Sequence, residues 1–130
     1  MAKIGTSPLH LSNVLAHEYA PEHGFCREAV TVNVASATDL KVGSVLGKIT
    51  ATGKYVPRNP AATDGSEVAA GIVLENISVA ATTDTAVTAL VRGNAIVKKA
   101  GLVFDVAHNA GQQATAIAEI EALAGVVLVR

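Results

Sequence analysis

The chain has 130 residues, of which 50% are hydrophobic and 16% are charged, and its formal net charge is −1. The length suits a single domain, and the composition excludes a chain that is disordered throughout, since such chains combine low hydrophobicity with high net charge. A charge so close to zero predicts no binding to nucleic acid or to an anionic membrane. No apolar run reaches the ~20 residues of a membrane-spanning helix, so we expect a soluble protein made in a cytoplasm.

The apolar residues are mostly Ala and Val, and the chain contains only two Phe, two Tyr and no Trp. Aromatic side chains bury the largest area per residue, so the core of one subunit is expected to be thin. Burial against other copies of the chain is one way to compensate.

Residues 1–25 have no sustained period and are expected to form a flexible N-terminal arm, followed by a single β-rich domain over residues 26–130. Within the arm, Leu11, Val14 and Leu15 are spaced as on one turn of a helix. The same residues also suit an extended segment docked on a partner. The sequence leaves both possibilities open.

Period-two patterns dominate the domain that follows the arm. Val30, Val32 and Val34 alternate with polar residues, which predicts a half-buried strand. The stretches 44–50 and 54–57 then predict a hairpin, because their short link contains a glycine that can adopt positive φ.

The middle of the chain predicts a loop followed by more strands. Residues 58–67 are rich in turn formers and are expected to be an exposed surface loop. Residues 68–75 form a near-continuous apolar run around Gly71, typical of a strand buried on both faces or closely approached by another backbone. Alternation resumes at 85–93, and a further short strand is expected at 95–98.

The spacing of apolar residues predicts a helix in one segment. Residues 112–125 place Ile117 and Ile120 at helical spacing, with Gly125 as the expected stop. The β-branched tail 126–130 is expected to pair back into the sheet. The fold class predicted is therefore mainly β: a compact small β-barrel or sandwich-like domain with one C-terminal helix.

No pattern predicts catalysis or a bound cofactor. The donor residues His10, His17, Glu18, His23 and Cys26 have irregular spacing without a CxxC or HExxH unit, so we expect no metal and interpret Cys26 as structural. The carboxylates sit singly in expected turns. Residues 40–49 resemble biotin- or lipoate-carrying hairpins but lack the Met-Lys-Met or Asp-Lys-Ala type of tip that displays the modified lysine in those modules. The chain is therefore not expected to be an enzyme.

Four blocks in order resemble the head decoration proteins of tailed phages. They are CREAVTV (26–32), the stretch 42–74, VTALVRGNAIV (87–97) and IAEIEALAGVVLVR (117–130). The most specific part is GKITATGKYVP with the Ala-Ala-Thr-Asp-Gly loop and the Ala-Gly-Ile-Val-Leu strand that follow it. The resemblance covers roughly residues 26–130.

The resemblance implies a structural role in the virion. A homotrimer would bind the major capsid protein on the outer surface of the expanded head, at three-fold or quasi-three-fold sites, and stabilise it against internal DNA pressure after assembly in the host cytoplasm. It also implies an N-terminal arm that orders on the capsid. The apolar and polar arm residues expected to contact the capsid are Leu9, Leu11, Ser12, Val14, Leu15 and Tyr19.

A second class of function stays open. A β-rich adhesion or receptor-binding module, displayed on a virion or a cell surface, would use the expected loop 58–67 as its binding site. An enzyme is the least favoured class because the sequence shows no convergent cluster of polar residues.

Overall fold

The computed structural model describes residues 15–18, 26–92, 95–123 and 127–130. Within these segments the chain forms ten strands and one α-helix. The strands are β1 (Leu15–Glu18), β2 (Arg27–Val32), β3 (Thr38–Leu40), β4 (Val45–Lys48), β5 (Tyr55–Pro57), β6 (Ala69–Val73), β7 (Ile77–Val79), β8 (Thr85–Leu90), β9 (Ala95–Val97) and β10 (Val127–Val129). The helix is α1 (Ala110–Glu121), and a short 3-10 turn covers Lys99–Gly101.

Five strands close into a barrel in the order β2-β5-β4-β6-β8. The longest pairing is antiparallel, between β2 and β8, and runs from Arg27 opposite Leu90 to Val32 opposite Thr85. The barrel closes through a parallel contact between β2 and β5, where Val32 lies opposite Tyr55. The mainly β class, with a small barrel and one C-terminal helix, is therefore confirmed.

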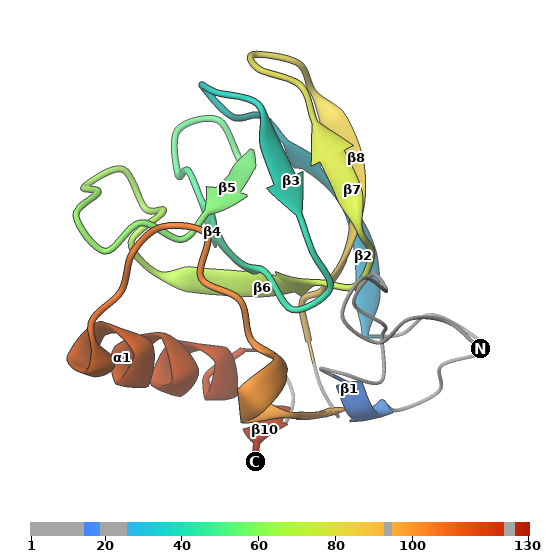
Figure 1. Cartoon of the computed structure of the whole chain (residues 1–130), viewed down its shortest axis with the longest axis vertical. Helices are drawn as coiled ribbons and strands as arrows, with labels where there is room; N and C mark the ends of the chain where they lie inside the picture. Colours follow the sequence, from blue (N-terminus) through green and yellow to red (C-terminus); the bar gives the residue numbers. More distant parts are fainter. Residues whose placement is uncertain (1–14, 19–25, 93–94, 124–126) are drawn as a thin grey trace, which may run out of the picture.

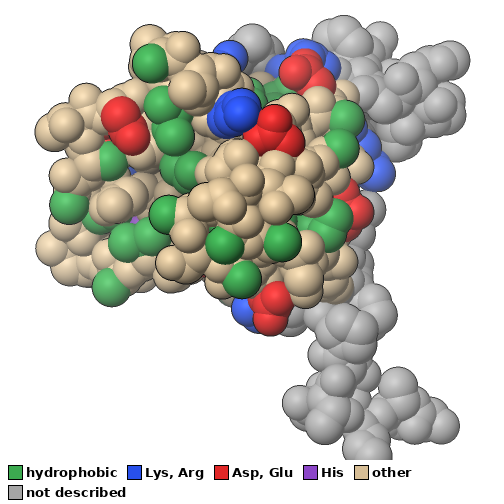
Figure 2. Space-filling model, turned by 90° about the horizontal axis from the view of Figure 1, so that it is seen from above, with side chains coloured by type: hydrophobic (Ala, Val, Ile, Leu, Met, Phe, Trp, Pro, Cys, Tyr) green, Lys and Arg blue, Asp and Glu red, His purple; other side chains and the backbone are tan. Residues whose placement is uncertain are grey.

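The remaining elements cover the barrel on two sides. Strands β3 and β7 form a two-stranded sheet, and β1, β9 and β10 form a three-stranded sheet with β9 in the middle. Figure 1 shows α1 lying below β6 with the three-stranded sheet beside it. Figure 2 views the opposite, loop-bearing end of the barrel, where acidic, basic and apolar side chains are interspersed.

Two buried apolar clusters lie on opposite faces of the same strands. Successive side chains of a strand point to opposite faces; Leu46 and Val73 belong to one cluster, and their neighbours Val45 and Ile72 belong to the other. The inner cluster, drawn from all five barrel strands, fills the barrel: Val30, Val32, Val34, Leu40, Leu46, Tyr55, Val73, Val79, Val87 and Ala89. The outer cluster lies between the barrel, the three-stranded sheet and α1: Cys26, Val42, Val45, Ala69, Ile72, Leu74, Leu90, Ala95, Val97 and Ile120.

Several local predictions are confirmed by this arrangement. Strand β6 is buried on both faces, and a Cβ at Gly71 would approach the carbonyl oxygen of Leu90 to 3.2 Å. Strands β4 and β5 form the expected antiparallel hairpin, whose link contains Gly53 at φ 70°. Alternation along β2 buries Val30 and Val32, as predicted.

The C-terminal predictions are confirmed in kind and adjusted in extent. Helix α1 begins with a capping box in which the Asn109 side chain accepts from the backbone N–H of Gln112, and the Gln112 side chain accepts from that of Asn109. The helix ends at Glu121, before the expected stop at Gly125, which lies outside the described residues. The tail pairs back into a sheet, as β10 parallel to β9.

The expectation that residues 58–67 form an exposed loop is wrong at both ends of the loop. Arg58 is 4% exposed and Ser66 is 2% exposed. Arg58 is drawn inward by an ion pair with Glu119 of α1. The backbone of Ser66 lies against Gly47, which leaves no room there for a Cβ. Two three-residue strands, β3 and β7, were not predicted from the sequence.

Part of the expected arm joins the body of the molecule. Residues Leu15–Glu18 are extended and form β1, which pairs antiparallel with β9. Of the two conformations that the sequence left open, these four residues adopt the extended one. The rest of segment 1–25 lies outside the described residues.

Candidate functional site

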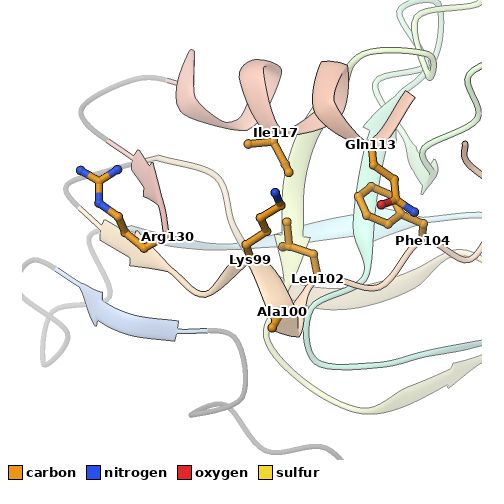
Figure 3. A pocket seen from close by; sticks show the side chains of 7 residues that line it. All are labelled: Lys99, Ala100, Leu102, Phe104, Gln113, Ile117 and Arg130. Carbon is orange, nitrogen blue, oxygen red and sulfur yellow. The ribbon is translucent and has the colours of Figure 1, made fainter. Parts of the chain in front are cut away.

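A hollow of about 500 Å³ opens beside the end of β10. We call it the basic hollow, because two cationic side chains stand at an otherwise mainly apolar surface (Figure 3). Its lining residues are Lys99, Ala100, Leu102, Phe104, Gln113, Ile117 and Arg130. A volume of this size falls within the ~300–1,000 Å³ typical of ligand pockets.

The backbone holds the two basic residues side by side at the ends of neighbouring strands, and their side chains diverge from there (Figure 3). The N–H of Arg130 donates to the carbonyl of Val97 at 2.9 Å, and the N–H of Lys99 donates to the carbonyl of Arg130 at 2.8 Å. These bonds extend the parallel pairing of β9 and β10 by one residue on each strand. Both side chains therefore start from fixed positions at the same edge of the hollow.

The apolar part of the hollow comes from two elements. Leu102 and Phe104 follow the 3-10 turn and pack, partly buried, against the outer cluster. Ile117 is a residue of α1 and lies one turn after Gln113, and residues four apart share a helix face. The helix thus contributes one amide and one aliphatic side chain to the same surface.

The aromatic side chain of the hollow, which we call the Phe104 wall, packs against the ring of His108. The two ring centroids are 4.6 Å apart. Since a guanidinium only donates, His108 accepts at Nε2 from Nη1 of Arg58 at 2.9 Å and donates from Nδ1 to the carbonyl of Val106 at 2.6 Å. His108 is therefore fixed on both sides, and it fixes the aromatic wall in turn.

Arg58 extends this support to the barrel. Its Nε donates to Oε1 of Glu119 at 3.0 Å, and the same carboxylate oxygen accepts from the backbone N–H of Ala69 at 2.9 Å. One buried guanidinium thereby joins the loop after β5, helix α1 and the start of β6. A buried charge needs such partners to offset its desolvation.

The carboxylates at the loop end of the barrel serve local structure. Asp64 accepts from the hydroxyl and the backbone N–H of Ser66, and these bonds lower the pKa of Asp64. Asp84 accepts from Asn33 at 2.7 Å and pairs with Lys54 at 2.9 Å, and these contacts lower its pKa. Both groups are stabilised in the ionised form, as expected for structural carboxylates in turns.

Metal donors do not gather in the part of the chain that the structure describes: no group of three His, Cys, Asp or Glu side chains is placed to hold an ion there. Of the donor set considered from the sequence, His10 and His23 lie outside that part. Cys26 is fully buried in the outer cluster, in keeping with a structural role. No helix in the described segments is long and apolar enough to cross a membrane.

Of the arm residues expected to contact the capsid, one lies in the described part of the chain. Leu15 lies in β1 opposite Val97 and packs, partly buried, against the outer cluster. The others lie outside the described residues: Leu9, Leu11, Ser12, Val14 and Tyr19.

Sequence reasoning missed the basic hollow because its parts are far apart in the chain. Lys99 is exposed and lines the hollow. The only local signal was the helical spacing of Gln113 and Ile117. Bringing Arg130 to Lys99 required the parallel pairing of β9 and β10, which no local period reveals.

The fold and the site define a class of protein: a small closed β-barrel backed by one helix, with a preformed surface hollow and no paired carboxylates arranged for acid–base chemistry among the residues described. The family model of the bacteriophage lambda head decoration protein D matches residues 4–126, and the chain belongs to this head decoration family. A search of curated proteins found no match.

Membership gives the chain its general role. It is a bacteriophage structural protein that decorates the capsid, so the capsid is its binding partner and the virion is its location. The family consists of structural capsid proteins and is not a family of enzymes.

Proposed function

We propose that the chain acts as a homotrimer that binds the outer surface of the expanded head at three-fold and quasi-three-fold sites and stabilises it against internal DNA pressure. The observation that carries this proposal is the family match, which spans residues 4–126 and thus includes most of the N-terminal segment as well as the barrel and α1. Binding to an expanded shell in multiples of three follows from this assembly.

The composition of the core supports the trimer. The largest fully buried side chains among the described residues are Leu, Ile and Val, and Tyr55 is the only aromatic residue in the two clusters' buried sets. Apolar area buried between subunits contributes ~25 cal/mol per Å², as in a core. We therefore expect subunits to stabilise one another, so that the melting temperature rises with protein concentration.

The N-terminal segment supplies the capsid contact in this proposal. Residues 1–25 act as an arm and residues 26–130 as the decoration domain, with β1 fastening the arm to the body through β9. An extended arm can add a strand to an exposed sheet edge of the capsid, with main-chain hydrogen bonds giving affinity. Three arms on one trimer raise a modest affinity by ~10²–10⁴ through effective concentration.

Deletion of residues 1–14 tests the arm without removing β1. The full chain is expected to have a mass of about three times 13.2 kDa. We expect the truncated chain to remain a trimer, with a mass lower by its three missing arms, and to lose co-sedimentation with expanded, empty capsids. Retention of β1 matters because Leu15 packs against the outer cluster. Wild-type affinity of the truncated chain would contradict the arm, and a monomeric mass for the full chain at micromolar concentration would contradict the trimer.

A further inference from the structure

The basic hollow differs in charge from the loop end of the barrel. The loop end of the barrel mixes charges of both signs (Figure 2), and its Lys54 is paired with Asp84. The hollow instead presents Lys99 and Arg130 with no carboxylate in its lining. Across the residues described, neither cation has an ion-pair partner.

The nearby carboxylate of Glu121 is already engaged elsewhere. Its Oε2 accepts from the backbone N–H of Val129 at 3.1 Å, on the outer edge of β10. The two cations of the hollow thus keep their hydrogen-bond donors for a ligand. An anion bound at either cation would be held by charge-assisted bonds, which are about twice as strong as neutral ones.

The apolar part of the hollow favours a ligand that carries an apolar group next to its anion. Leu102, Phe104 and Ile117 form a surface against which an aliphatic or aromatic side chain can pack (Figure 3). Phe104 does not need to be ordered on binding, because the His108 ring already packs against it in a tilted arrangement, with the centroids 4.6 Å apart, and is itself bonded to Arg58. A preformed wall lowers the entropic cost of association.

We propose that the basic hollow binds an acidic–apolar segment of the capsid protein, with a carboxylate on Lys99, Arg130 adding positive charge at the rim, and the adjacent side chain on the Phe104 wall. The position of the hollow supports this occupant. β10, whose end forms one edge of the hollow, shares a sheet with β1, the strand to which the arm leads (Figure 1). This inference rests on the proposed arm contact, which would bring the same side of the molecule to the capsid.

Charge reversal tests the hollow while the arm is left intact. The variant is Lys99→Glu with Arg130→Glu, and the matched control is Lys48→Glu with Lys54→Glu, which changes the net charge equally on the β4–β5 hairpin. We expect the hollow variant to bind expanded capsids at least about tenfold more weakly, and the control to stay within about threefold of wild type. Thermal melts of both variants establish that they fold.

The two proposals fail in different ways in this experiment. Equal binding by the hollow variant and the control, with wild type decorating normally, would overturn the hollow as a capsid contact and leave the proposed function standing. Failure of the wild-type chain to bind capsids at all would overturn the proposed function and this inference together.

A small probe tests the chemistry of the hollow without the capsid. Anilinonaphthalene sulfonate joins an anion to fused rings, and we expect wild type to enhance its fluorescence and the hollow variant to lose that enhancement. Octanoate should displace the probe and octanol should not, because only octanoate carries the anion. Equal displacement by both would overturn the role of the two cations. Octanoate binding with unchanged decoration by the hollow variant would instead indicate a small-carboxylate site and overturn the capsid segment as occupant.

Discussion

The inside of the barrel and the layer between the barrel and α1 are built from alternate residues of the same strands, yet they contain different chemistry. The inner cluster consists of aliphatic side chains and Tyr55. The outer layer adds the buried Arg58, its partners Glu119 and His108, and the basic hollow. The barrel interior thus supplies a rigid body, and the outer layer carries the polar contacts that shape a binding surface.

This difference reflects how each layer is held together. Close-packed apolar side chains need only the right volume and pattern. The outer layer joins segments far apart in the chain, and Arg58 specifies their arrangement because its donors fit one set of acceptors. Perturbing each layer separately should therefore have different consequences for stability and for the hollow.

The largest effect is expected inside the barrel. Leu46→Ala removes a fully buried side chain of β4 and leaves a cavity in the inner cluster. The free energy of unfolding should fall by about 3 kcal/mol, within the range for buried Leu→Ala changes, as measured by denaturant titration.

The matched control for the barrel is Val68→Ala at a side chain that is 48% exposed. This truncation should change the free energy of unfolding by less than about 0.5 kcal/mol. A loss at Leu46 no larger than the loss at Val68 would contradict a close-packed barrel interior.

An intermediate effect is expected in the outer layer. Arg58→Lys keeps the charge but replaces the fork that reaches Glu119 and His108 with a single ammonium. The loss should be about 2 kcal/mol, since hydrogen bonds of charged groups contribute ~1.5–3 kcal/mol. Loss of the His108 support should also weaken binding of anilinonaphthalene sulfonate to the hollow, whereas Leu46→Ala should leave that binding unchanged in the folded fraction.

Arg92→Lys provides the comparison for this charge-conserving change. Arg92 donates to Glu28 at 2.7 Å, but the two side chains are 33% and 53% exposed. Exposed pairs contribute ~0–1 kcal/mol, so the effect should be well below that of Arg58→Lys. Equal losses in the free energy of unfolding for the two variants would show that burial of Arg58 does not strengthen its interactions.

The smallest expected effect is on the pH dependence of the free energy of unfolding, through Asp84 at the loop end of the barrel. The Asn33 hydrogen bond and the Lys54 ion pair lower the pKa of Asp84 in the folded state. The folded state therefore binds this proton less readily than the unfolded chain, and the stabilisation is present above the unfolded pKa of ~3.9 and is lost as the pH falls through the lower, folded value. Asp84→Asn should flatten the pH dependence of unfolding below about pH 5, and an unchanged slope would contradict the assignment.

The barrel strands could be predicted from the sequence, whereas the contacts of the outer layer could not. Alternation at Val30 and Val32, and the apolar run around Gly71, are local patterns and correctly predict barrel strands. Burial of Arg58 was missed because turn-forming neighbours indicate an exposed loop, and the ion pair with Glu119 depends on where α1 packs. The basic hollow was missed for the same reason, since it requires β10 to lie parallel to β9.

Decoration is tested most directly by mixing the purified full chain with expanded, empty heads of the phage that encodes it and counting the copies bound per capsid. If the chain is a trimeric decoration protein, binding should saturate in multiples of three on the outer surface, and the decorated heads should resist heat disruption better than bare ones. Absence of binding to expanded heads at micromolar protein would contradict this role.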